Sequence, residues 1–389
     1  MKKLLFEISL YETPTKGSLP EEFQISLLPR AILRSGRAGY KKKLAIMFVT
    51  FLGLCFYPVG LRAENQSDLT GCAAIEDSAL RLQCYDEMAG RQNASDAAPG
   101  DDAVQNEDLD TFSEPAKPSY MSRLWELDEN RARNKLAIKM HRSNYILPYS
   151  YNFSPNEKPF EEAFPERDIL GSEVAFQLSI KTKIWQDLMF KNVDLWFGYT
   201  QRSFWQFYNF QDSAPFRETN YEPEVLVNLP VNLNMLGLMN LRTVNLGFNH
   251  QSNGNSEPLS RSWNRIVANF GFERENVFSY GDTLVLELKS WYRIPESEGS
   301  DDNPYIEDYM GDGEIWVYYL KEKQRFGMMV RNNLDSDDMR GALQLEWSFP
   351  LSDRVSGYIQ GFTGYGESLL DYDHSVNRVG VGFILTDWD

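Results

Sequence analysis

The stretch Glu173-Val-Ala-Phe-Gln-Leu-Ser-Ile-Lys-Thr-Lys-Ile184 has an apolar residue at almost every second position. The apolar residues share one parity: Val174, Phe176, Leu178, Ile180 and Ile184. The polar and charged residues share the other: Glu173, Gln177, Ser179, Lys181 and Lys183. Because successive side chains of a β-strand point to opposite faces, this pattern predicts a strand with one apolar and one polar face.

The same alternation recurs in segments 284–289, 342–349 and 378–385. Short runs of this kind, separated by Asn, Asp, Gly and Pro, give roughly twelve candidate strands between Tyr145 and Leu385. A soluble β-sandwich also shows alternation. Here the polar faces carry several charges per strand and the apolar faces are long. We therefore predict an all-β fold, an antiparallel transmembrane β-barrel, which closes because lipid offers the backbone no hydrogen-bond partners.

The composition is compatible with this fold. The chain has 389 residues, 39 basic and 56 acidic side chains, and a net charge of -17. Its mean hydropathy of -0.46 suits a soluble protein, but also a barrel with a polar lumen. The acidic balance argues against nucleic acid as a partner, because binding phosphates requires basic patches.

A basic region followed by the apolar stretch 44–55 indicates a secretory signal. This stretch is too short for a membrane span of about 20 residues. We predict an N-terminal extension and signal peptide over 1–63, with cleavage after Ala63. A lipoprotein anchor at Cys55 is the alternative, but Leu54 is larger than the residue that usually precedes such a cysteine.

Three further regions follow. Residues 64–90 are predicted to form a small helical segment in which Cys72 and Cys84 pair, because an exported chain meets an oxidising compartment; two free thiols are the alternative. Residues 91–142 are predicted to be a linker and a charged stretch, with helical character over 121–142. The barrel is predicted over 143–389.

The candidate chemistry starts from a histidine. The chain has three: His141 and His374, which we expect to be solvated surface residues, and His250. His250 and Ser252 lie two residues apart on the apolar face of their strand, the lipid side of a barrel. Imidazole and hydroxyl can meet there, as a general base and a serine nucleophile require.

Asn264 lies on the next predicted strand, with the parity of the apolar residue Ile266. An antiparallel return brings Asn264 beside His250, where the amide oxygen can accept the imidazole N–H and fix its tautomer. The alternative is that these polar residues only mark the end of the membrane band.

The segments His250-Gln-Ser252-Asn-Gly254 and Ser260-Arg-Ser-Trp-Asn264-Arg265 resemble the signature of the outer-membrane phospholipase A family. The resemblance continues in 213–223, 301–304, 309–311 and 364–372, and covers the chain from Tyr145 onward. It implies a barrel in the bacterial outer membrane with its active site on the outer-leaflet side. It also implies a Ser252–His250–Asn264 triad that hydrolyses the sn-1 and sn-2 acyl esters of phospholipids and lysophospholipids. A non-enzymatic barrel, a porin or a structural protein, is the alternative.

The resemblance further implies calcium as cofactor and activation by dimerisation. Calcium would be bound by Ser260, the carbonyl of Asn255 and Ser213 from a second subunit. The family usually has Arg at the position of Asn255, a change that a carbonyl ligand tolerates.

Three more positions follow from the resemblance. The backbone N–H of Gly254 would stabilise the oxyanion together with the ion. Glu257, where the family usually has Asp, and Asp302 match a second, weaker calcium site. Gln201 matches a residue of the dimer interface. The chain ends Thr386-Asp-Trp-Asp389, without the terminal Phe common in outer-membrane barrels.

Overall fold

The computed structural model describes residues 118–127, 136–165, 167–297 and 299–385. It also describes six isolated positions, the last four with helical backbone: Ile75, Asp77, Ser78, Leu80, Arg81 and Cys84. The predicted signal peptide and the linker up to residue 117 lie outside the described residues, as does the C-terminal tetrapeptide. Cys84 is disulfide-bonded. Its predicted partner Cys72 is not described, so that pairing stays a prediction.

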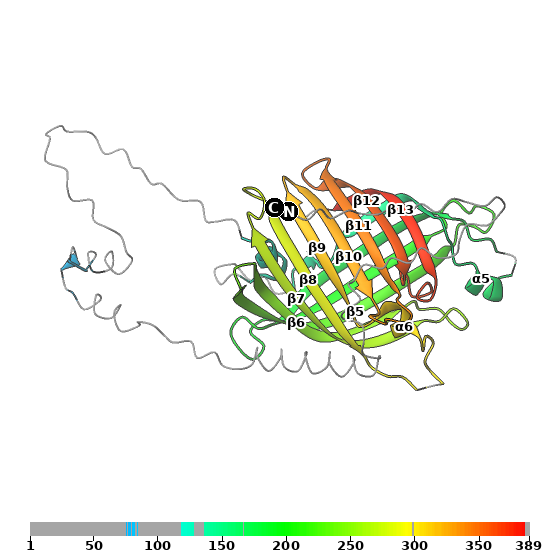
Figure 1. Ribbon diagram of the computed structural model, residues 1–389, viewed down its shortest axis with the longest axis horizontal. Coiled ribbons are helices and arrows are strands. Elements are labelled where there is room, and N and C mark those ends of the chain that lie inside the picture. The colour runs from blue at the N-terminus through cyan, green and yellow to red at the C-terminus, as the bar shows by residue number, and fades with distance from the viewer. Residues whose placement is uncertain are drawn as a thin grey trace, which may run out of the picture. The chain divides into compact units, whose positions relative to one another are not determined.

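Twelve antiparallel strands, β2 to β13, form the wall of a closed barrel (Figure 1). Each strand pairs with the next along the chain, and β13 pairs with β2 to close the wall. The strands are β2 (Asn144–Asn152), β3 (Ser172–Trp185), β4 (Asp194–Trp205), β5 (Phe216–Met235), β6 (Met239–Ser252), β7 (Ser262–Glu275), β8 (Thr283–Arg293), β9 (Gly313–Lys321), β10 (Gln324–Asn332), β11 (Gly341–Pro350), β12 (Val355–Tyr365) and β13 (Ser375–Leu385). The predicted twelve-stranded barrel is confirmed.

Two strands, β1 and β2, pair with the same edge of β3, one after the other. A short strand, β1 (Ile138–Met140), pairs with Ile180–Thr182 of β3, while β2 pairs with the part of β3 from Ser172 to Gln177. The sheet therefore starts before residue 143. The helical character predicted over 121–142 is confirmed at α4 (Tyr120–Trp125) and is wrong at β1, where pairing with β3 overrides it.

The two ends of the barrel differ in their connections. One end, called here the loop end, carries the long loops 153–171, 206–215, 253–261, 294–312, 333–340 and 366–374. Two of these loops contain short helices, α5 (Lys158–Ala163) and α6 (Ile306–Met310). The opposite turn end carries the shorter connections 186–193, 236–238, 276–282, 322–323 and 351–354. In the described part of the chain, no helix is long and apolar enough to cross a membrane.

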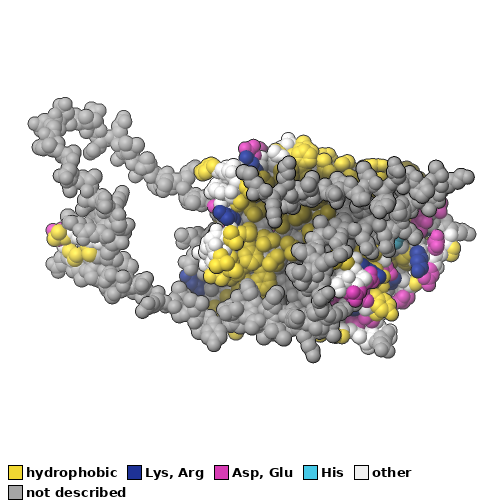
Figure 2. All heavy atoms as spheres, in the orientation of Figure 1, with side chains coloured by type: hydrophobic (Ala, Val, Ile, Leu, Met, Phe, Trp, Pro, Cys, Tyr) yellow, Lys and Arg dark blue, Asp and Glu magenta, His cyan; other side chains and the backbone are white. Residues whose placement is uncertain are grey.

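The barrel wall is apolar outside and polar inside. On β3, Leu178 is 48% exposed and Lys181 only 2%. On β11, Leu345 is 51% exposed and Glu346 only 6%. On the part of the wall that is visible in Figure 2, hydrophobic side chains lie between the two ends, and charged side chains are seen mainly toward the ends. The predicted parity of both strands is therefore confirmed, and an apolar wall of this kind suits contact with lipid.

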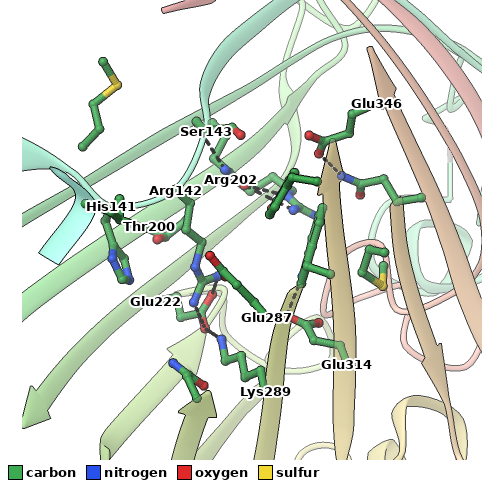
Figure 3. Close-up of a pocket in the computed structure, with 18 of the residues that line it drawn as sticks. His141, Arg142, Ser143, Thr200, Arg202, Glu222, Glu287, Lys289, Glu314 and Glu346 are labelled. Carbon is green, nitrogen blue, oxygen red and sulfur yellow. Dashed lines mark hydrogen bonds and ion pairs between the residues drawn. The ribbon is translucent and has the colours of Figure 1, made fainter. Parts of the chain in front are cut away.

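Ion pairs fill the lumen (Figure 3). Arg142 lies 2.8 Å from Glu222 and 3.1 Å from Glu224. His141 was predicted to be a solvated surface residue, and this is wrong. Its side chain is 7% exposed and its Nε2 lies 2.6 Å from Glu224, because the break between β1 and β2 places residues 141–143 inside the barrel. His374 is half-buried, with Nε2 3.0 Å from the carbonyl oxygen of Ser154.

Helix α4 packs against the inner wall near the turn end of the lumen. The backbone N–H of Met121 donates to Glu273 near the end of β7 over 2.9 Å. Trp125 packs edge-to-face on Trp196 of β4, and the Lys181 ammonium lies 3.4 Å from the ring centroid of Trp125. Both Met121 and Trp125 are buried. A cavity of about 250 Å³ remains in the lumen, lined mainly by charged and polar side chains.

Candidate active site

The pairing of β6 with β7 builds the candidate catalytic pair. His250 and Asn264 are direct cross-strand partners. The Nδ1 atom of His250 lies 2.8 Å from the Oδ1 atom of Asn264. Phe248 and Ile266, which have the same parity, are 44% and 51% exposed on the outer wall. The pair predicted from the sequence is therefore formed, and it lies on the outward face at the loop end.

Ser252 has the same outward parity and ends β6. It is half-buried, and its cross-strand partners are Tyr221 of β5 and Ser262 of β7. Within the described residues, the Ser252 hydroxyl has no hydrogen bond, and so none to His250. With Nδ1–H donated to Asn264, the Nε2 atom of His250 is the acceptor that a general base needs. The hydrogen bond between a nucleophile and its general base is often long or absent before substrate binds.

The loop 253–261 follows Ser252 directly and is organised by the buried Asn253. Its Oδ1 accepts the backbone N–H groups of Asn255 (3.2 Å) and Arg261 (3.0 Å). Gly254 has a φ of +68°, a conformation that glycine adopts without strain, and an added Cβ would lie 3.2 Å from the Tyr221 ring. The hydrogen bonds of Asn253 and the positive φ of Gly254 thus define the backbone conformation of the loop directly after Ser252.

The predicted calcium ligands are only partly brought together. The Ser260 hydroxyl donates to Asp302 over 2.5 Å, which joins the loops 253–261 and 294–312. Asn255 and Glu257 are exposed on the first of these loops. Ser213 is exposed on the loop 206–215, and no hydrogen bond joins it to 253–261 among the described residues.

The donor set itself suits calcium. Hydroxyl, carbonyl and carboxylate oxygens are the ligands that this hard cation prefers. No group of three or more His, Cys, Asp or Glu side chains that could hold a metal occurs in the described part of the chain. A calcium site here would therefore depend on the Ser260 hydroxyl, backbone carbonyl groups and at most one or two carboxylates.

A second loop supports this region from behind. Leu370, in the loop 366–374, packs in one apolar cluster with Leu259. The neighbouring Asp371 is fully buried, which acts to raise its pKa. The Arg217 guanidinium (2.9 Å) and the Ser368 hydroxyl (2.7 Å) outweigh this and hold the pKa of Asp371 below its usual value. Asp371 therefore stays ionised and anchors its loop.

Gln201 lies on the outward face of β4. Its Oε1 accepts the Tyr199 hydroxyl over 3.1 Å, and its Nε2 donates to Ser203 over 3.2 Å. A polar row facing lipid is costly unless its members are paired, which these contacts achieve in part.

One carboxylate in contact with this site was missed at the sequence level. The Nδ2 atom of Asn264 donates to Oε1 of Glu296 over 3.1 Å. Glu296 lies in the loop 294–312, where no spacing or periodicity relates it to Asn264; only the folded loop reveals the contact.

Comparisons with known proteins identify the family of this chain. Residues 121–385 match the model of the family described as phospholipase A1. A relative from Neisseria meningitidis serogroup B is 35% identical over 365 residues, which cover 82% of this chain and 91% of the relative.

Solved structures match as well. The outer membrane phospholipase A from Escherichia coli is 33% identical, with a TM-score of 0.60, and the match covers 66% of this chain and 95% of that one. A Salmonella typhi outer membrane phospholipase, solved as a dimer with bound calcium, gives the same TM-score, identity and coverage. The chain belongs to the phospholipase A1 family.

Proposed function

We propose that this protein hydrolyses the sn-1 and sn-2 acyl esters of membrane phospholipids and lysophospholipids, with Ser252 as nucleophile. The observation that carries the proposal is the hydrogen bond between His250 and Asn264 on the outer wall, on the same face as Ser252. A histidine oriented by an amide next to a serine has the parts that nucleophilic acyl transfer requires. The family membership supports a phospholipase.

The reaction follows from the roles of these residues. The Ser252 oxygen attacks the ester carbonyl carbon while its proton passes to Nε2 of His250. The C–O bond to the lysophospholipid breaks, and His250 returns the proton to that leaving alcohol. Water, deprotonated by the same Nε2, then attacks the acyl-serine ester and releases the fatty acid. The backbone N–H of Gly254 donates to the carbonyl oxygen when it carries negative charge.

The position of the triad determines how substrate arrives. His250, Ser252 and Asn264 share the apolar outer wall at the loop end, not the lumen. An acyl chain can therefore lie against the wall while its ester reaches Ser252. We place the loop end at the outer leaflet of the outer membrane, which agrees with the outer-membrane location in the name of the E. coli relative.

Ser260, the carbonyl of Asn255 and Ser213 of a second copy would hold calcium, with Glu257 and Asp302 as a weaker second site. When bound, the ion would supply positive charge beside the oxyanion. Ser213 is exposed on its own loop in one chain, which fits a ligand that completes the site in a second copy. Gln201, on the outward face of β4, would lie in the dimer interface.

Calcium removal tests the proposed function. Purified, folded protein in phospholipid micelles is expected to release fatty acid with calcium present and to lose this activity with a chelator. Re-addition of calcium should restore it, and magnesium should not, because magnesium demands a tighter octahedral oxygen shell. Fatty acid is measured by titration. Absence of release with calcium present would refute the proposal.

The lumen argues against the alternative of a porin. Helix α4 packs inside the turn end, and ion pairs such as Arg142 with Glu222 and Glu224 lie in the interior. We therefore expect the protein in a planar lipid bilayer to show no stable conductance steps. Regular steps at the level of a general porin would mean that the lumen is open to ions.

A further inference from the structure

The side chain of Asn264 is bound on both sides. Its Oδ1 faces Nδ1 of His250 at 2.8 Å, and its Nδ2 donates to Glu296 at 3.1 Å. A carboxylate can only accept hydrogen bonds, so Glu296 selects the amide orientation in which the NH₂ group points toward it. The oxygen is then directed at His250.

This orientation matters for the base. A flipped amide would present its NH₂ group to Nδ1 of His250, and Nδ1 would have to be the unprotonated nitrogen. The proton would then sit on Nε2, which could not accept one from Ser252. A free asparagine has no intrinsic preference between the two orientations, so a triad that uses an amide needs a second contact to choose one.

The fold fixes Glu296 at this place. Beyond the last β7–β8 cross-strand pair, the Ile294 N–H donates to the Asn264 carbonyl oxygen over 2.8 Å. Pro295 follows, and its ring fixes φ near −65°. Glu296 is half-buried, and within the described residues no ion pair neutralises its carboxylate. The backbone hydrogen bond between Ile294 and Asn264, which extends the β7–β8 pairing, thus places the Glu296 carboxylate beside the Asn264 amide.

We propose that Glu296 is a positioning residue that extends the Ser252–His250–Asn264 arrangement to four members. It orients the Asn264 amide and supplies the negative charge that a neutral amide lacks when His250 becomes an imidazolium. The inference rests on the proposed function and deepens it. Loss of such an outer contact typically costs 10- to 100-fold, by analogy with the partners of metal-bound histidines.

The test compares Glu296→Ala and Glu296→Gln with wild type, by kcat and KM for a phospholipid in mixed micelles with calcium. Glu296→Ala is expected to lower kcat by roughly 10- to 100-fold with little change in KM. Glu296→Gln should recover only part of that loss, because its amide oxygen can still accept from Asn264 but the side chain is neutral and its NH₂ group no longer enforces one orientation of the Asn264 amide. Glu162→Gln, which alters an exposed carboxylate on α5 at the same end of the barrel, is the matched control and should behave as wild type.

A double-mutant cycle separates positioning from a purely structural effect. If Glu296 acts through Asn264, Glu296→Ala should cause no further loss in an Asn264→Ala background. An equal loss in both backgrounds, or a Glu296→Ala enzyme with wild-type kcat, would overturn the role of Glu296 alone. An inactive wild-type protein would overturn the proposed function and this inference together.

Discussion

Ser252→Ala is expected to lower phospholipid hydrolysis by at least roughly 10⁴-fold, because removing the nucleophile of a triad abolishes the acyl-enzyme route. The barrel should remain intact. Ser252 is half-buried, and no hydrogen bond of its hydroxyl occurs in the described part of the chain, so alanine leaves no buried partner unpaired. Fatty-acid release gives the activity, and circular dichroism confirms the β-sheet.

The chain offers a matched control across the strand. Ser262 is the cross-strand partner of Ser252 on β7 and shares the outward parity of Asn264. Ser262→Ala removes the same atoms at the same depth and should keep most of the activity. A sulfonyl fluoride should label wild type and Ser262→Ala, but not Ser252→Ala. If Ser262→Ala instead loses both activity and labelling, the nucleophile has been assigned to the wrong strand.

The sequence predicted this pair of strands well for a physical reason. A one-residue slip would turn every apolar side chain of β6 into the lumen, so hydrophobic parity fixes the face on which each residue lies. With Phe248 and Ile266 outward, His250 and Asn264 had to share that face.

Parity could not predict features that depend on chain breaks or on loops. His141 is inside because the first strand is interrupted, and its burial follows from the contact with Glu224. In the sequence, Met121 and Trp125 belong to a short apolar segment like many others, and only the structure shows that α4 lies in the lumen with both side chains buried. Glu296 reaches Asn264 only through the path of the loop 294–312. Long-range contacts of this kind leave no local pattern.

Arg217→Met is expected to lower the free energy of unfolding by about 3 to 5 kcal/mol, the usual cost of removing one partner of a buried ion pair. Its guanidinium lies 2.5 Å from Glu173 and 2.9 Å from Asp371, and all three side chains are at most 1% exposed. Methionine fills similar volume but leaves the buried Asp371 carboxylate without a cation and Glu173 with only Arg378, 3.5 Å away. Urea unfolding of the protein in lipid vesicles, followed by tryptophan fluorescence, measures the change.

An exposed ion pair provides the control for this substitution. Lys323 lies 3.4 Å from Asp353 in the turn end, with side chains 57% and 93% exposed. Water solvates both charges whether or not they pair, so Lys323→Met should leave the unfolding midpoint almost unchanged. If the two substitutions destabilise the barrel equally, burial is not what makes the Arg217 pairs important. If only Arg217→Met does, the polar lumen depends on complete pairing, because its charges cannot reach water when a partner is removed.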